Sequence, residues 1–312
     1  MKKKIINFIV ILFTVIVFLE IIINNKDVYN IIKNSIYTWI NVLVPSLFPF
    51  FIISDILIDY NIIKYIPKQI RLIMCKVFRI SEAGLTILLL SLISGFPSNA
   101  RNARTLYDKG KISEKEASYV LMFTHFSNPL FILTTVGLIF FKNRKLGIVI
   151  LLSHYLANII LGIIIRGPRE VFDKGSSLEK EDPDQGFGKI LTNSIRHAID
   201  TLLLIFGTLT IFLVIAGLII SKFNLSGYKA MAIKGILEMT MGLQELSLLK
   251  VSPLGKAIIS SMMISFGGLS VHMQVLSQIA GTKIKYYYFL LGRIFQGIIA
   301  GVLAVIFYRI ML

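Results

Sequence analysis

The sequence has few of the charged residues that keep a soluble domain in water. Only 16% of its 312 residues are charged, whereas ordinary soluble domains carry about a quarter. Hydrophobic residues make up 55%, and the mean hydropathy is +0.76. This composition excludes a disordered chain, argues against a water-soluble domain and indicates a polytopic membrane protein.

Cysteine and acidic residues are also scarce. The single cysteine, Cys75, excludes an internal disulfide framework and any cysteine-cluster metal site. The 17 acidic residues are outnumbered by 33 basic ones, so the formal net charge is +16. Because the basic residues lie between apolar runs, we expect the lipid bilayer and its anionic headgroups as partner, and no nucleic acid.

The motifs of the common catalytic constellations are missing. There is no Gly-x-Ser-x-Gly elbow, no P-loop and no His-Glu-x-x-His helix. The four histidines are scattered over different segments. We therefore predict that the protein is not an enzyme and has no metal or cofactor; a membrane enzyme with a convergent arrangement of residues is the alternative.

Long apolar runs dominate the chain. Six are long enough to cross a membrane, at residues 5–23, 35–58, 118–141, 146–165, 195–220 and 286–310. They are continuous rather than alternating, which predicts an all-α polytopic membrane protein and not a β-barrel. The first run resembles a signal peptide but is longer than a usual apolar core and lacks a small-residue cleavage site, so we predict a retained helix.

Two shorter runs stop inside the apolar region. Residues 83–98 break at Gly95-Phe96-Pro97, and residues 255–271 break at Gly267-Gly268. Broken backbone at membrane depth is tolerated only where protein or a water-filled cavity satisfies the freed groups. We predict that both runs are re-entrant half-helices, with residues 229–254 as a third candidate.

The pattern predicts four segments: an N-terminal transmembrane helix (1–33), a first repeat (34–165), a polar linker (166–192) and a second repeat (193–312). Each repeat has the same order of span, basic segment, apolar run broken at glycine, polar stretch and span. The distribution of basic residues orients the two halves oppositely. Inverted halves with broken helices are the architecture of secondary transporters, whose site lies where the breaks meet.

The first predicted site follows the break in the first half. Gly95 allows close backbone approach to a ligand, and Pro97 ends the half-helix. Ser98 and Asn99 offer polar groups next to Phe96. Arg101 and Arg104 stand one turn apart; they either clamp a carboxylate or extend to lipid headgroups.

A second polar stretch lies inside an apolar run. Ser127 and Asn128 are placed to line a cavity, and Pro129 frees a backbone carbonyl about one turn earlier. His125 either titrates near neutral pH or is a hydrogen-bonded structural residue.

In the second half the corresponding residues are Glu238, Thr240, Gly267, Gly268 and Ser270. An intramembrane carboxylate costs at least about 2.5 kcal/mol to insert, so Glu238 is a functional candidate. The alternative is a structural ion pair with Lys234, four residues earlier.

Three stretches carry a family resemblance: residues 94–97 (Ser-Gly-Phe-Pro), 106–113 (Leu-Tyr-Asp-Lys-Gly-Lys-Ile-Ser) and 127–132 (Ser-Asn-Pro-Leu-Phe-Ile). They resemble the YlbJ-type sporulation integral membrane proteins of endospore-forming bacteria, which carry the Gate, or nucleoside-recognition, module. The resemblance covers most of residues 35–310. The chain departs from the commoner pattern at Ser98-Asn99 and at residues 125–129.

The resemblance implies a multi-pass protein of the mother-cell or outer forespore membrane that moves dipicolinic acid, a small anionic aromatic substrate. Arg101, Arg104 and Phe96 suit such a dianion. The alternative is a nucleoside-type permease, whose cargo suits Asn99, Asn128 and Glu238 better. A non-transporting scaffold is a third reading. Coupling to Na+ or H+ is open, because the breaks offer backbone carbonyls and Glu238 and His125 offer proton sites.

Overall fold

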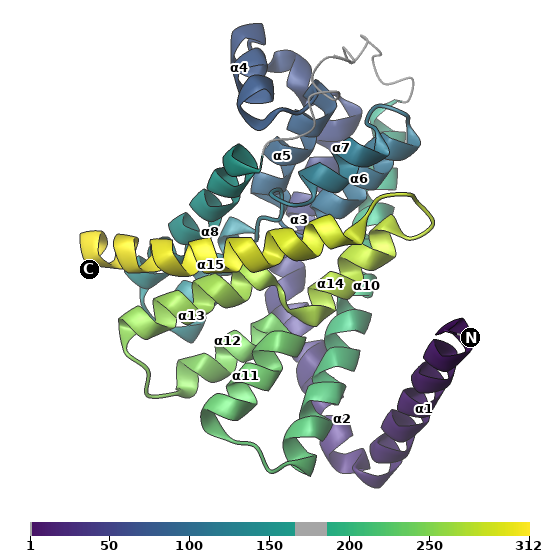
Figure 1. Cartoon of the computed structure of the whole chain (residues 1–312), viewed down its shortest axis with the longest axis vertical. Coiled ribbons are helices and arrows are strands. Elements are labelled where there is room, and N and C mark those ends of the chain that lie inside the picture. Colours follow the sequence, from purple (N-terminus) through teal and green to yellow (C-terminus); the bar gives the residue numbers. More distant parts are fainter. Residues whose placement is uncertain (1, 166–185) are drawn as a thin grey trace.

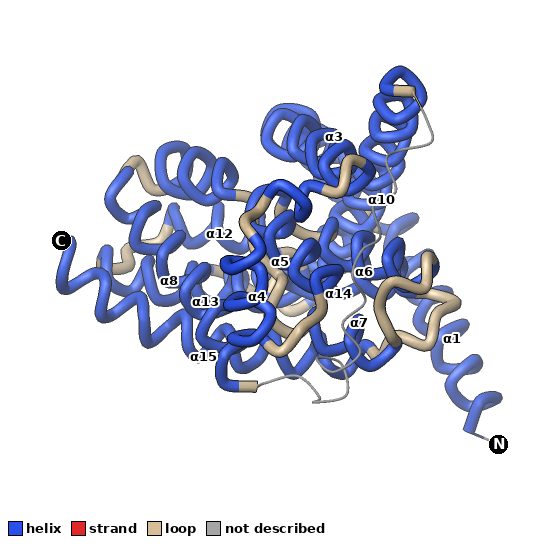
Figure 2. The backbone as a smooth tube through the Cα atoms, turned by 90° about the horizontal axis from the view of Figure 1, so that it is seen from above, coloured by secondary structure: helices blue, strands red, loops and turns tan. Residues whose placement is uncertain are grey.

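The protein is an assembly of helices. The computed structural model describes residues 2–165 and 186–312, and within them every regular element is helical (Figures 1 and 2). In this described part of the chain, five helical segments are long and apolar enough to cross a membrane, or up to six if one bent pair counts as a span. The prediction of an all-α polytopic membrane protein is confirmed. The five are Asn25–Asp59, Arg144–Ile164, Phe187–Lys222, Pro253–Ile279 and Tyr286–Met311.

The N-terminal part is a helical hairpin followed by a long span. Helix α1 (Lys2–Ile23) turns at Asn24 into α2 (Asn25–Thr38), which continues through the π-helical turn η1 (Trp39–Leu43) into α3 (Val44–Asp59). Pro45 and Pro49 lack the N–H groups of a regular helix, and a π turn directly before them absorbs the irregularity. The predicted boundary at residue 33 therefore falls inside a continuous helix.

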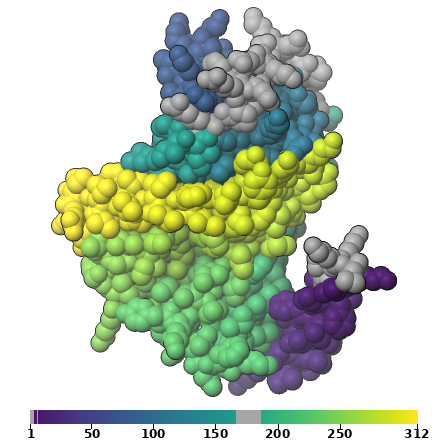
Figure 3. Space-filling model, viewed as in Figure 1, coloured from purple at the N-terminus to yellow at the C-terminus, as the bar shows by residue number. Residues whose placement is uncertain are grey.

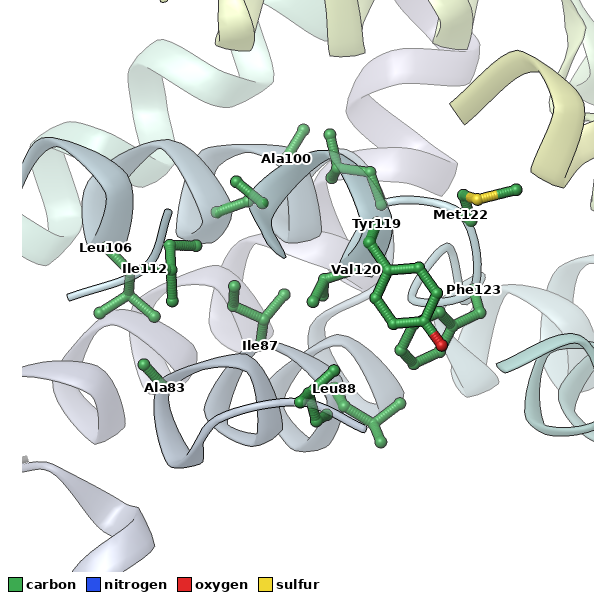
Figure 4. Packing of buried hydrophobic residues seen from close by; sticks show 14 of the residues in the cluster. Ala83, Ile87, Leu88, Ala100, Leu106, Ile112, Tyr119, Val120, Met122 and Phe123 are labelled. Carbon is green, nitrogen blue, oxygen red and sulfur yellow. The ribbon is translucent and has the colours of Figure 1, made fainter. Parts of the chain in front are cut away.

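The first predicted break, at Gly95-Phe96-Pro97, is confirmed: the helix before it ends at Ser94. The chain passes through η2 (Ile62–Tyr65) and α4 (Lys68–Phe78), bends by 91° into α5 (Glu82–Ser94), and leaves the helix at Gly95. After the break, α6 (Ser98–Asp108) runs back along α5, with Ala83 lying across from Leu106 and Ile112 (Figure 4). The pair is the first hairpin, and its tip is the Gly95-Phe96-Pro97 break.

A buried carboxyl group holds the base of this hairpin. Glu116 lies in α7 (Glu114–Val120) and is 3% exposed. Its Oε1 accepts the backbone N–H of Ser81 at 2.7 Å. Burial raises the pKa of the Glu116 carboxyl, and the hydrogen bond from Ser81 partly offsets this. The contact ties α7 to the start of α5.

The predicted continuous span at 118–141 is wrong. Helix α7 ends at Val120. Helical structure resumes only at residues 129–130, which lead directly into the π-helix η3 (Phe131–Phe140). Pro129 explains the interruption, because it lacks an N–H and disfavours helical backbone at the residue before it. The chain then continues as α8 (Arg144–Ile164).

The second half begins earlier than expected. Helix α10 (Phe187–Lys222) includes residues 187–192, which were predicted to be linker, and residues 166–185 of that linker lie outside the described residues. Helices α11 (Gly227–Leu237) and α12 (Met239–Leu248) pack together as the second hairpin. Its open ends are joined by a hydrogen bond from the Tyr228 hydroxyl to the Lys250 carbonyl at 3.2 Å. The third half-helix candidate, 229–254, is therefore a hairpin.

The break at Gly267 is confirmed, but the half-helix at 255–271 is not. Helices α13 (Pro253–Phe266) and α14 (Gly268–Ile279) flank Gly267, and together they form a 27-residue candidate span. Gly267 has a φ of +89° and is both the C-cap of α13 and the N-cap of α14. The next helix therefore starts directly after the break.

The last helix, α15 (Tyr286–Met311), crosses the middle of the molecule in Figure 1. In Figure 3 it forms a band between residues of the first half and residues 225–280. It packs on α8 and α13. In Figure 1 the first hairpin, α5 and α6, lies on one side of α15, and α11 and α12 of the second lie on the other.

Two glycines set the spacing of the second hairpin. A Cβ atom added to Gly242 would lie 2.3 Å from the Cα of Gly235. Real atoms do not approach so closely, so this contact exists only because both residues lack side chains.

We expect Gly242→Ala to lower the thermal unfolding midpoint of the purified protein, because the new methyl group pushes α11 and α12 apart. Overpacking of this kind costs about 1–3 kcal/mol. Gly207→Ala in α10 is the control: its Cβ would meet no atom within 4 Å, so the midpoint should stay the same or rise. Equal midpoints for both variants would show that the hairpin does not depend on the glycine contact.

Candidate functional site

Four helix breaks meet at the centre of the protein: the tip of the first hairpin, residues 121–128, the tip of the second hairpin, and Gly267. A Cβ atom on Gly95 would lie 2.6 Å from the backbone N of Asn128. One on Gly268 would lie 3.0 Å from the N of Met239, and one on Gly267 would lie 3.2 Å from Nε2 of His125. Each hairpin tip therefore touches the broken span of its own half, and the two broken spans touch each other.

A small cavity lies between these breaks. Its volume is about 30 Å³, room for one or two water molecules. Five of the predicted site residues line it, and they come from three breaks: Phe96, Ser127, Asn128, Glu238 and Thr240. Met239 and Gln274 line it as well. Gln274, on α14, was not expected; its Nε2 donates to the Thr208 hydroxyl of α10 at 3.0 Å.

The remaining predicted residues lie outside the lining. The glycines, prolines and Ser98 form the breaks themselves: the Ser98 hydroxyl donates to the Gly95 carbonyl, and the Phe96–Pro97 peptide is cis. The predicted site residues that do not line the cavity are Gly95, Pro97, Ser98, Asn99, Arg101, Arg104, His125, Pro129, Gly267, Gly268 and Ser270.

Asn128 joins two breaks. Its Nδ2 donates to the Ile93 carbonyl at 3.1 Å, near the end of α5, and its Oδ1 accepts the Leu130 N–H at 2.8 Å, just before η3. One side chain thus satisfies a carbonyl of the first hairpin and an amide of the broken span.

Several buried polar groups at the breaks have no hydrogen-bond partner in the described protein. They are both amide atoms of Asn99, both ring nitrogens of His125, and the hydroxyl of Ser270. All three residues are 0% exposed. The His125 ring stacks on Phe96, with centroids 4.4 Å apart. A buried polar group without a partner costs about 1–3 kcal/mol, so these atoms mark a place that suits a polar solute.

Glu238 is the ionisable residue of the cavity. It is 3% exposed, and its Oε2 accepts the Met241 N–H at 2.9 Å, which caps α12. The alternative pairing with Lys234 is wrong, because Lys234 Nζ binds Glu245 at 2.6 Å. Glu238 therefore has no basic partner within ion-pair distance in the described part of the chain.

Arg101 and Arg104 are engaged elsewhere. Arg101 forms an ion pair with the buried Asp55 of α3 and donates to the Thr201 hydroxyl of α10 at 3.3 Å. Arg104 binds Asp108 at 2.5 Å and the Ala280 carbonyl at 2.6 Å. In this conformation neither guanidinium reaches the cavity.

The sequence reasoning missed a polar cluster behind the cavity. His154 of α8 accepts the Ser127 N–H on Nε2 at 2.9 Å. The neutral ring must then carry its proton on Nδ1, which faces the Ser265 hydroxyl at 2.9 Å. The same cluster contains Asn158, Arg293 and Gln296. The available signal was the polar pair Arg293 and Gln296, three residues apart in an otherwise apolar run.

Comparison with known proteins gives one family model and one similar protein. The family model Gate, described as nucleoside recognition, matches residues 40–144. The chain is 30% identical over 313 aligned positions to the sporulation integral membrane protein YlbJ of Bacillus subtilis (strain 168), covering 89% of this chain and 76% of that protein. No solved structure matches.

We expect a strong energetic coupling between Asp55 and Arg101. Breaking a buried ion pair by removing one partner costs about 3–5 kcal/mol, so Asp55→Asn and Arg101→Gln should each be strongly destabilising and their double variant less than additive. The exposed pair Arg104 and Asp108 on the same helix is the control and should couple by about 0.3–0.5 kcal/mol. Thermal unfolding of both double-mutant cycles measures this; equal couplings would show that the buried Asp55–Arg101 pair stabilises the fold no more than an exposed pair does.

Proposed function

Because the chain belongs to the YlbJ family of sporulation integral membrane proteins, we propose that it is a transporter that moves a small polar solute across a membrane. The solute binds where the four helix breaks meet. The observation that carries the proposal is the set of buried polar atoms without partners on Asn99, His125 and Ser270. Buried polar groups are almost always hydrogen-bonded, so a polar partner at these atoms supports the proposal.

Dipicolinic acid is the first candidate cargo. The family resemblance implies it, and two helix ends support an anion: α6 and α14 both begin at a break without a side-chain cap. Helix N-termini carry a partial positive charge, and in secondary transporters such half-helix ends face anionic substrates.

A nucleoside is the second candidate, and Glu238 favours it. The carboxylate lines the cavity beside Thr240, Asn128 and Gln274, and no basic side chain lines it. This set can accept and donate hydrogen bonds to a neutral sugar and base, whereas it offers a dicarboxylate no cationic side chain. The description of the matched family model as nucleoside recognition points the same way.

Flux into proteoliposomes that contain this protein alone tests the function. We expect labelled dipicolinate or labelled nucleosides to cross the bilayer faster than in empty liposomes. A protein that moves neither solute would support the scaffold reading and contradict the proposal.

Glu238→Gln separates the two cargos. Glutamine can still accept the Met241 N–H, so the cap of α12 survives while the charge is lost. If the cargo is a nucleoside, its apparent affinity should fall about ten- to a hundredfold, the value of a charge-assisted hydrogen bond. If the cargo is dipicolinate, flux should be unchanged or faster. Glu245→Gln, on the same helix but paired with Lys234, is the control and should leave both fluxes unchanged.

A further inference from the structure

Arg293 is a fully buried cation that faces backbone carbonyls of two helix breaks. It is 0% exposed. Its Nη2 donates to the Met122 carbonyl at 2.6 Å, and its Nη1 donates to the Ser265 carbonyl at 3.3 Å and to the His125 carbonyl at 3.5 Å. Met122 and His125 belong to the interruption after α7, and Ser265 lies in the last turn of α13.

Two side-chain oxygens complete the set. Nη1 also binds Oε1 of Gln296, and Nη2 is 3.5 Å from Oδ1 of Asn158. The guanidinium lies over the ring of Phe289, 5.1 Å from its centroid, which adds a cation–π contact. In residues 2–165 and 186–312 no carboxylate lies within ion-pair distance of Arg293. Only neutral oxygens and a ring therefore balance this charge.

These oxygens are of the kind that binds a metal cation in other transporters. The carbonyl ends of α7 and α13 carry partial negative charge. In secondary transporters, unwound carbonyls and half-helix C-terminal ends coordinate Na+ or a proton-carrying group. Here the same type of cage holds a guanidinium that cannot dissociate, because it is tethered to α15.

We propose that Arg293 is a built-in substitute for a coupling cation: its guanidinium joins the breaks of the two halves, and no Na+ binds between them. The transport part of this statement rests on the proposed function. The stability part does not, because it concerns only how the breaks are held together.

The packing of α15 supports this role. A Cβ atom on Gly292 would lie 2.3 Å from the Met122 carbonyl oxygen, so the missing side chain lets α15 approach the break closely. Gln296, one turn further on, is held by its Nε2 donating to the His154 carbonyl at 3.2 Å. The helix thus presents Arg293 and its partner Gln296 to the breaks in a fixed position.

The first test is chemical rescue of the purified full chain. Arg293→Ala should lower the thermal unfolding midpoint by about 5 °C or more, because several buried carbonyls lose their donors. Guanidinium chloride at millimolar, non-denaturing concentration should restore part of this loss, whereas N-methylglucamine chloride at the same concentration should not. Arg309→Ala, at the exposed end of the same helix, is the control and should show neither effect. An Arg293→Ala variant that guanidinium does not stabilise would overturn the proposal.

Two further variants test whether the site needs a cation if Arg293→Ala does not fold. Arg293→Lys keeps a cation and should fold with a lowered midpoint, because an ammonium lacks the planar fork. Arg293→Met keeps an apolar stem without charge and should be less stable than Arg293→Lys. A methionine variant as stable as the lysine variant would show that the oxygens need no cation.

The second test separates this inference from the proposed function. The midpoint of the wild-type protein should be the same in sodium chloride and in choline chloride. Solute flux into proteoliposomes should be the same with and without an inward Na+ gradient. If no solute moves but guanidinium still stabilises Arg293→Ala, the proposed transport function is contradicted, whereas the role of Arg293 as a built-in cation is supported. If Na+ raises the wild-type midpoint or drives flux, the inference is wrong.

Discussion

The structure depends on one constraint: backbone groups freed inside an apolar bundle must find partners within the protein. Four helix breaks release such groups at the centre, and each is served by a particular side chain. Asn128 bridges α5 and η3, His154 accepts the Ser127 N–H, and Glu238 caps α12. Arg293 donates hydrogen bonds to the carbonyls of Met122 and Ser265. These four polar side chains of the core are therefore first of all the partners of its broken backbone, in contrast to Asn99, His125 and Ser270.

The same constraint explains how charge is distributed around the cavity. Three basic side chains near the breaks already have partners: Arg101 pairs with Asp55, Lys234 pairs with Glu245, and Arg293 donates to carbonyl oxygens. The carboxylate of Glu238 is left to define the electrostatic character of the cavity. A dicarboxylate cargo would then rely on helix N-termini, and a neutral cargo on hydrogen bonds.

Glycine makes the convergence of the breaks physically possible. At Gly95, Gly242 and Gly292 a single methyl group would come within 2.6 Å of backbone in another segment. Backbone therefore meets backbone at the hairpin tips and at α15. This close approach leaves a cavity of only about 30 Å³ between the breaks.

The sequence by itself determined that the protein is helical and embedded in a membrane, and it located the breaks at Gly95 and Gly267, because glycine and proline act on local backbone. It did not reveal that residues 118–141 are interrupted or that α14 continues beyond Gly267. Only the tertiary structure decided that Arg101 faces Asp55, that Lys234 faces Glu245, and that Arg293 faces the breaks. Those partners lie on segments far apart in the chain or across a hairpin, and hydrophobic periodicity carries no information about which polar groups packing brings together.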